Sequence, residues 1–72
     1  MASDDLIDME GVISLVHPGG TFSVHTEQGH TVQAHLAGRL RRFRIRVVLG
    51  DRVTVAVSPY DLSKGRITFR HK

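Results

Sequence analysis

Five arginines lie within eight residues near the middle of the chain. They are Arg39, Arg41, Arg42, Arg44 and Arg46. A guanidinium group offers a planar fork of hydrogen-bond donors and a face for stacking, which suits phosphates and bases. Five such groups this close repel one another, and a bound polyanion would relieve that repulsion. The run therefore predicts contact with nucleic acid, its arginines directed at phosphates.

Charge is divided sharply along the chain. Residues 1–38 hold five acids and no lysine or arginine, a charge of −5, whereas residues 39–72 carry +8. The net charge of +3 therefore hides a strongly basic half that would attract polyanions. Strand alternation over 66–70 places Arg66, Thr68 and Arg70 on the outward face, and Lys64 begins the same stretch. These cations are predicted to extend the basic surface.

Three histidines, His25, His30 and His35, recur every five residues. Odd spacing along a strand places residues on opposite faces, and no cysteine or acid completes a ligand set. We therefore predict no metal site and no cofactor. His30 at a predicted hairpin turn and His35 on the polar face of a strand are predicted to contact RNA, the alternative being ordinary surface histidines.

The chain has four aromatic residues: Phe22, Phe43, Tyr60 and Phe69. Alternation places Phe22 and Phe69 on inward faces, which leaves Tyr60 and Phe43 to present a ring. Binders of single strands display several exposed aromatics on which bases stack. The scarcity of aromatics favours recognition of a structured RNA by shape and backbone.

Nothing in the sequence is typical of catalysis. The carboxylates lie in the N-terminal tail or beside turns, and no nucleophile-elbow or phosphate-loop pattern occurs. We predict a binding protein and not an enzyme. No apolar stretch approaches the roughly 20 residues of a membrane span. The acidic N-terminus without an apolar core and the absence of cysteine favour a cytoplasmic location.

A small barrel must position these groups. Residues 1–6 are predicted to be a flexible acidic tail and residues 7–72 a single RNA-binding domain, because the chain is too short for a second core. Period-two alternation and turn residues predict strands over 9–16, 21–26, 31–36, 52–57 and 66–70. Gly11 is expected to mark a bulge or a close backbone approach.

The connections complete the expected fold. Leu40 and Phe43, three residues apart, predict a short helix within 37–43, and residues 58–65 a loop. Leu40, Phe43, Ile45 and Val47 are expected to hold the arginine run against the core. Five strands with a helical turn between the third and fourth is the order of an all-β OB-fold barrel. An SH3-like barrel is the second choice because it normally lacks that helix.

Several segments resemble bacterial translation initiation factor 1. They are Gly29-His30, Ala34-His35, Gly38-Arg39, Arg41-Arg42, Ile45-Arg46, Gly50–Val53, Pro59–Ile67 and Phe69-Arg70. The resemblance covers about residues 5–72, and the stretch from Tyr60 to Ile67 is its most specific part. It implies an S1-like OB-fold that binds the 30S ribosomal subunit at the aminoacyl-tRNA site. It also implies contacts with 16S rRNA and a ribosomal protein, and cooperation with the other two initiation factors.

The resemblance also implies a set of RNA-binding residues. With Arg44 added from the run, they are His30, His35, Arg39, Arg41, Arg42, Arg44, Arg46, Tyr60, Lys64, Arg66 and Arg70. The chain departs from the family at Phe43-Arg44, which moves an aromatic by one position and adds a charge. It also departs at Ser23, where the family commonly has arginine.

Two alternatives remain beside a monomeric initiation factor. A general RNA chaperone of the cold-shock or S1-module type would bind unstructured single strands as well as ribosomes. An SH3-like adaptor would bind a protein through an aromatic groove and keep its affinity at high salt. Phosphate contacts instead predict an affinity that falls as salt rises.

Overall fold

The computed structural model describes residues 6–42 and 46–71, apart from the side chain of Arg39. Its elements are β1 (Ile7–His17), β2 (Thr21–Thr26), β3 (Thr31–Leu36), α1 (Gly38–Arg42), β4 (Arg52–Ser58) and β5 (Asp61–His71). The predicted tail lies outside the described residues except for Leu6, and so do Phe43, Arg44 and Ile45.

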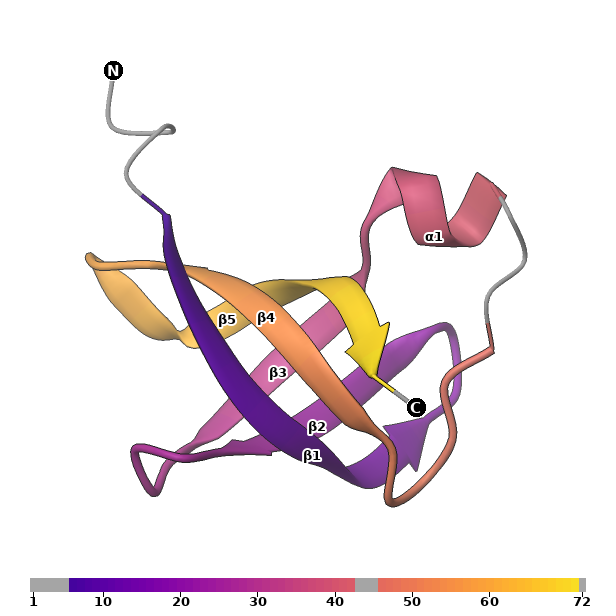
Figure 1. Cartoon of the computed structure of the whole chain (residues 1–72), viewed down its shortest axis with the longest axis horizontal. Coiled ribbons are helices and arrows are strands. Elements are labelled where there is room, and N and C mark those ends of the chain that lie inside the picture. Colours follow the sequence, from indigo (N-terminus) through magenta and orange to yellow (C-terminus); the bar gives the residue numbers. More distant parts are fainter. Residues whose placement is uncertain (1–5, 43–45, 72) are drawn as a thin grey trace.

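The five strands form a closed barrel in the order β1-β2-β3-β5-β4, and β4 pairs back onto β1 (Figure 1). Four ladders are antiparallel, and the β3–β5 ladder is parallel. A parallel pair needs a crossover connection, which α1 and β4 provide. The predicted OB-fold, with its helix between the third and fourth strands, is confirmed.

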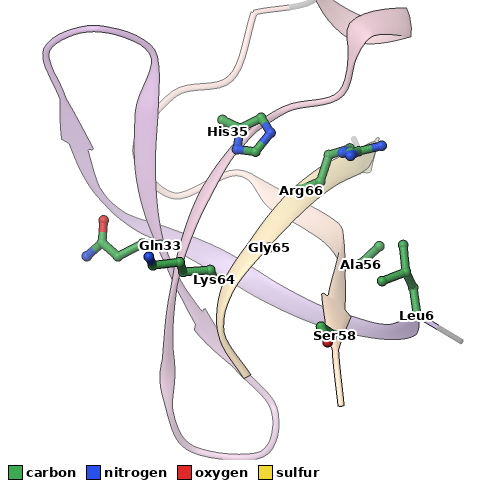
Figure 2. A pocket seen from close by; sticks show the side chains of 8 residues that line it. All are labelled: Leu6, Gln33, His35, Ala56, Ser58, Lys64, Gly65 and Arg66. Atoms are coloured by element: carbon green, nitrogen blue, oxygen red, sulfur yellow. The ribbon is translucent and has the colours of Figure 1, made fainter. Parts of the chain in front are cut away.

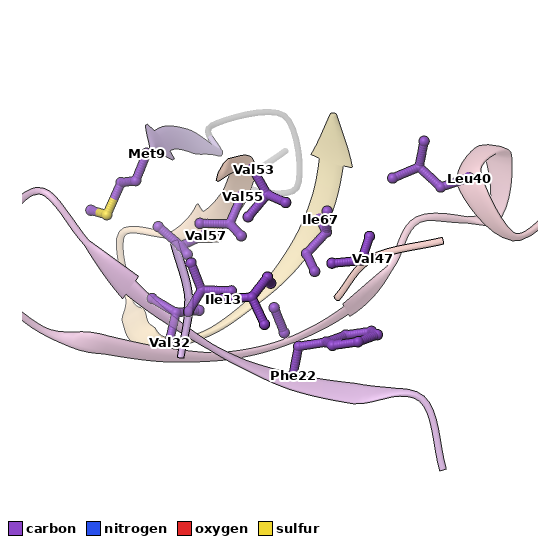
Figure 3. Close-up of a cluster of buried hydrophobic side chains, with 12 residues drawn as sticks. Met9, Ile13, Phe22, Val32, Leu40, Val47, Val53, Val55, Val57 and Ile67 are labelled. Carbon is purple, nitrogen blue, oxygen red and sulfur yellow. The ribbon is translucent and has the colours of Figure 1, made fainter. Parts of the chain in front are cut away.

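Alternation along the strands builds the core. Val24, Val32, Val53, Val55, Val57 and Ile67 have no exposed surface. Figure 3 shows most of these inward side chains, among them Val32, Val55 and Ile67. It also shows Leu40 of α1 and Val47, which extend toward the barrel from outside it. Leu40 is 7% exposed and Val47 8% exposed. Two of the four predicted anchors of the arginine run therefore reach the core.

Gly11 lies at a close approach between β1 and β2, as the sequence suggested. A Cβ there would lie 2.6 Å from both the His25 carbonyl oxygen and Val24 Cγ1. The register of the β1–β2 ladder shifts between Ile13 and Leu15, which leaves Ser14 as the extra residue of a bulge. The close approach and the bulge are therefore separate features of β1.

The sequence-based description of residues 58–70 is wrong in two respects. Strand β5 begins at Asp61, so most of the predicted loop is strand. The β4–β5 register pairs Val55 with Ile67 but Thr54 with Phe69, which makes Thr68 an extra residue. This bulge reverses the alternation after Ile67.

The reversal exchanges the predicted positions of two neighbouring side chains. Phe69 pairs with the outward Thr54 and is 57% exposed, although alternation placed it in the core. Arg70 pairs with the fully buried Val53 and is partly buried, although alternation placed it outward. A single unpaired residue causes both errors.

Candidate nucleic-acid interface

The parallel β3–β5 ladder assembles a row of polar side chains on the outside of the barrel. Its register places Gln33 beside Lys64 and His35 beside Arg66. All four residues are exposed. Figure 2 shows the two pairs projecting from adjacent strands. The pairing brings residues from distant parts of the sequence onto one face.

A hollow of about 360 Å³ lies beside this row. The small residues Ala56 and Gly65 leave space between the longer side chains, and Leu6 and Ser58 border the side away from β3 (Figure 2). Lys64 and Arg66 supply positive charge at its border. A shallow hollow with cations at its border suits an anionic ligand that also carries flat apolar groups, as a nucleotide does.

A second hollow, of about 140 Å³, connects this row to the arginine run. It is lined by Gly19, Gly20, Thr21, His35, Leu36 and Arg41. Because His35 borders both hollows, Arg41 of α1 and Arg66 of β5 lie on either side of it. The structure therefore brings part of the arginine run together with the predicted residues of β3 and β5.

Helix α1 holds its arginines outward. Leu40 is buried in the core cluster, whereas Arg41 and Arg42, which follow it, are exposed. The Arg41 backbone N–H donates to the Ala37 carbonyl at 3.1 Å, and Ala37 N–H donates to Ile67 O at 2.9 Å. The helix is thus attached to β5. Arg46 is also exposed, whereas Arg44 and the Arg39 side chain are outside the described part of the chain.

Two of the predicted RNA-binding residues make contacts within the protein. His30 Nε2 lies 3.2 Å from the Leu62 carbonyl oxygen, and Nδ1 lies 3.3 Å from Thr26 Oγ1. Both ring nitrogens therefore join the β2–β3 turn to β5. Arg70 Nε lies 3.2 Å from Asp51 Oδ2. RNA contacts by His30 and Arg70 stay predictions, but each residue has a structural role.

Tyr60 occupies the turn between β4 and β5 and is 81% exposed, as expected for an aromatic able to stack. Its backbone N–H donates to Ser58 Oγ at 3.1 Å. Next to it, Asp61 Oδ1 accepts hydrogen bonds from the Ser63 hydroxyl at 2.5 Å and from the Ser63 N–H at 3.1 Å. These two bonds, with a smaller contribution from Lys64, hold the pKa of Asp61 below its ordinary value of 3.8. The Asp61 carboxylate therefore orders the turn that carries Tyr60.

Sequence reasoning missed Gln33 and its hydrogen bond to the Ser23 hydroxyl on β2. Gln33 Nε2 donates to Ser23 Oγ at 3.2 Å, and His17 Nε2 lies 2.7 Å from the same oxygen. Ser23 is only 3% exposed, so its hydroxyl links β1, β2 and β3. Alternation along 31–36 already placed Gln33 outward beside His35, and that signal would have found it.

The three histidines lie along the β2–β3 hairpin. His25 and His35 are both exposed, and His30 is partly buried at the turn between the two strands. His25 pairs near the hairpin turn, and His35 pairs at its far end with Thr21. Within residues 6–42 and 46–71, no three His, Cys, Asp or Glu side chains gather where a metal ion could be held. In the same residues, no helix has the length and apolar character to cross a membrane.

The fold and this surface define a small OB-fold barrel with one cationic side. A family model described as translation initiation factor 1A / IF-1 matches residues 2–72, and the chain belongs to this family. Proteins named translation initiation factor IF-1 from Solibacter usitatus and Oenococcus oeni are 57% and 53% identical over 72 residues. In both cases the match covers all of each chain.

Solved structures agree on the fold. The solution structure of translation initiation factor 1 from the Wolbachia endosymbiont of Brugia malayi matches with a TM-score of 0.76 and 39% identity. That match covers 93% of this chain and 79% of the other. YjeQ from Thermotoga maritima matches with a TM-score of 0.75 but only 22% identity, over 92% of this chain and 23% of its own. The YjeQ match shows a shared barrel only.

Proposed function

We propose that this chain binds the 30S ribosomal subunit at the aminoacyl-tRNA site through 16S rRNA and promotes initiation with the other two initiation factors. Membership of the IF-1 family supports a role in initiation. The proposed activity is binding without chemical turnover, and it places the chain in the cytoplasm, where ribosomes assemble.

The observation that carries the RNA-binding part is the continuity of one cationic surface. Arg66 and Lys64 stand in the β3–β5 row, and Arg41 borders the adjoining hollow with His35 between them. Rigid strands and a helix anchored by Leu40 fix the spacing of these groups before any ligand binds. A fixed set of cations lowers the entropic cost of gripping a folded backbone.

The opposite charge elsewhere on the barrel supports an oriented contact. Glu10 and Glu27 lie on the side where β1 meets β4, and Arg52 there is paired with both of them. A polyanion is therefore attracted to the β3–β5 side and repelled from the other. The remaining predicted contacts, at Arg39, Arg42, Arg44, Arg46 and Tyr60, extend the same proposal along α1 and the turns.

Binding to purified subunits tests the proposal. The wild-type chain is expected to bind small subunits and to compete with tRNA for the aminoacyl-tRNA site, whereas Arg66→Glu and Arg41→Glu abolish most of the binding. Arg52→Ala removes a cation from the other side and serves as the control. Binding to large subunits alone, or an affinity that does not change with salt, would refute the proposal.

A further inference from the structure

A buried hydroxyl beside the β3–β5 row holds one of the side chains of that row. Ser23 of β2 is 3% exposed, and its Oγ accepts a hydrogen bond from Gln33 Nε2 of β3 at 3.2 Å. His17 Nε2 of β1 lies 2.7 Å from the same oxygen. A hydroxyl donates one hydrogen bond and accepts two, so Ser23 can make both contacts at once. The Gln33 amide is therefore connected through Ser23 to two other strands.

The bulge in β1 fixes Ser23 itself. The register shift there leaves Ser14 as the extra residue, and its hydroxyl donates to the Ser23 carbonyl oxygen at 3.2 Å. On its other side, the Ser23 backbone pairs with Gln33 across the β2–β3 ladder. A side chain that is ordered before binding loses little entropy when a ligand meets it. Gln33 is ordered in this way although it is exposed.

The bond to Ser23 uses only part of the Gln33 amide. A primary amide has two N–H donors and a carbonyl oxygen that accepts hydrogen bonds. One N–H is directed at Ser23, which leaves the second N–H and Oε1 to meet a ligand. The exposed position of Gln33 makes both groups accessible. Gln33 therefore offers an uncharged donor and acceptor side by side, next to the cations of the β3–β5 row.

Lys64 determines which part of a nucleic acid reaches this amide. The parallel register places Lys64 beside Gln33 (Figure 2), and neighbouring strands lie about 4.8 Å apart. Phosphate and sugar alternate along a nucleic-acid backbone, so a phosphate bound by Lys64 brings the adjoining sugar to Gln33. The described residues that line the hollow beside the row include no phenylalanine or tyrosine on which a base could stack. The sugar is therefore the group that Gln33 meets.

We propose that Gln33 distinguishes RNA from DNA by binding a ribose 2′-hydroxyl next to the phosphate held by Lys64. The 2′-hydroxyl is both a donor and an acceptor, as the amide is, and DNA lacks it. The inference rests on the proposed function and deepens it, since it names the chemical group of the RNA that this part of the row recognises. Ser23 is a positioning residue, because it holds the amide while its own side chain is buried.

Two hairpins of one sequence, one of RNA and one of 2′-fluoro RNA, test the contact at low salt. The fluorine removes the hydroxyl but keeps the A-form helix, so the comparison separates the hydroxyl from the shape. Gln33→Met is expected to weaken binding to the RNA hairpin about five-fold, the effect of one hydrogen bond, and to leave binding to the 2′-fluoro hairpin unchanged. Fluorescence anisotropy measures the affinities. An equal loss on both hairpins, as for the reading of a base, would overturn the inference.

Gln28→Met is the matched control, since Gln28 is the other glutamine of the chain and is exposed in the β2–β3 turn. It is expected to bind both hairpins as the wild type does. Ser23→Ala is expected to reduce the preference for the RNA hairpin about two- to three-fold, because the Gln33 amide must then be ordered on binding. A loss in Gln28→Met equal to that in Gln33→Met, or an unchanged preference in Ser23→Ala, contradicts the inference.

The salt dependence separates this contact from a phosphate contact. Gln33→Met is expected to keep the wild-type slope of log affinity against log salt, because no phosphate contact is lost, and a shallower slope would refute the inference. Thermal unfolding of all three variants checks that the barrel is intact. The two proposals fail in distinguishable ways. If the wild-type chain does not bind 30S subunits, the proposed function fails. Normal binding to 30S subunits with equal affinity for the two hairpins, or with no affinity for either, refutes only the contact of Gln33 with ribose.

Discussion

Arg70 Nε lies 3.2 Å from Asp51 Oδ2, so the end of β5 is tied to the turn that precedes β4. The Nε atom is buried and makes no hydrogen bond to any described residue, which makes the contact an ion pair whose carboxylate balances a buried charge. Asp51 Oδ2 also accepts the Val48 N–H at 3.0 Å. One carboxylate therefore orders the segment that follows the arginine run.

Removal of that carboxylate is expected to destabilise the fold. Asp51→Ala loses the ion pair and the Val48 bond and should lower the free energy of unfolding by about 2–3 kcal/mol. Asp51→Asn can keep the bond to Val48 and should cost about 1 kcal/mol less. Urea unfolding measures both. If Arg70→Met removes the difference between Asp51→Ala and the wild type, the coupling is confirmed, whereas simple additivity of the two changes rules it out.

The salt dependence of binding should identify which cations touch phosphates. Lys64→Ala and Arg66→Ala should each make the slope of log affinity against log salt shallower by about 0.7–0.9, the effect of one lost phosphate contact. Arg52→Ala, on the acidic side of the barrel, should leave the slope unchanged. Titration of 30S subunits at several salt concentrations measures the three slopes. Equal slopes in all the variants would exclude direct phosphate contacts by Lys64 and Arg66.

Leu40 should control affinity although it carries no charge. Its side chain is 7% exposed and belongs to the core cluster, so Leu40→Ala should lower the free energy of unfolding by about 2–4 kcal/mol. Because the same side chain holds α1, binding to 30S subunits should weaken at temperatures where the barrel remains folded. Circular dichroism checks folding before affinity is measured. Unchanged affinity in the folded variant would mean that α1 is not held by Leu40.

Two glycines of the same barrel should respond oppositely to alanine. A Cβ on Gly65 would lie 2.7 Å from Val57 Cγ1 and 2.9 Å from the Ala56 carbonyl oxygen. Gly65→Ala should therefore force β4 and β5 apart and lower the free energy of unfolding by about 1–3 kcal/mol. At Gly38, the first residue of α1, a Cβ meets nothing within 4 Å, and Gly38→Ala should be neutral or stabilise by about 0.5 kcal/mol. Chemical denaturation compares the two, and equal effects would contradict the packing argument.

The turn that carries Tyr60 should loosen only in acid. The pKa of Asp61 is held below 3.8 by its hydrogen bonds with Ser63. For a carboxylate with a lowered pKa, the added stability is complete above the ordinary pKa and is lost as pH falls through the lowered one. Titration of the Asp61 carboxyl by NMR should show the lowered value, and Ser63→Ala should return it toward 3.8. A normal pKa in the unaltered chain would rule out this ordering.

The sequence predicted the barrel because its inward residues are dense and regular. Val53, Val55 and Val57 alternate without interruption, and the inward positions of β2 and β3 do the same, so each strand has one possible buried face. The same alternation predicted the position of the cationic surface. Neighbouring residues of a strand point to opposite faces, so Arg66 and His35 point outward because Ile67 and Leu36 point inward.

The positions of Phe69 and Arg70 were not predicted because they depend on a single unpaired residue. Nothing in the types of Ser14 or Thr68 marks them as bulge residues, yet the bulge at Thr68 places Phe69 outside and turns Arg70 toward Asp51. Period-two alternation assumes that the register between neighbouring strands does not change. The position of a bulge depends on the partner strand, so it cannot be predicted from one strand alone. The contacts of His30 with Thr26 and Leu62 were not predicted for a different reason: they depend on where β5 passes the β2–β3 turn, which the order of residues along the chain does not show.

The pairing of β5 with both β3 and β4 has a consequence for folding during synthesis. Until β5 has emerged, the nascent chain has two unpaired strand edges, and the sheet stays open between them. Closure then depends on contacts between distant parts of the chain, which form slowly. We expect the barrel to mature after translation of β5, so that cleavage within this strand opens both edges at once and exposes the chain to aggregation.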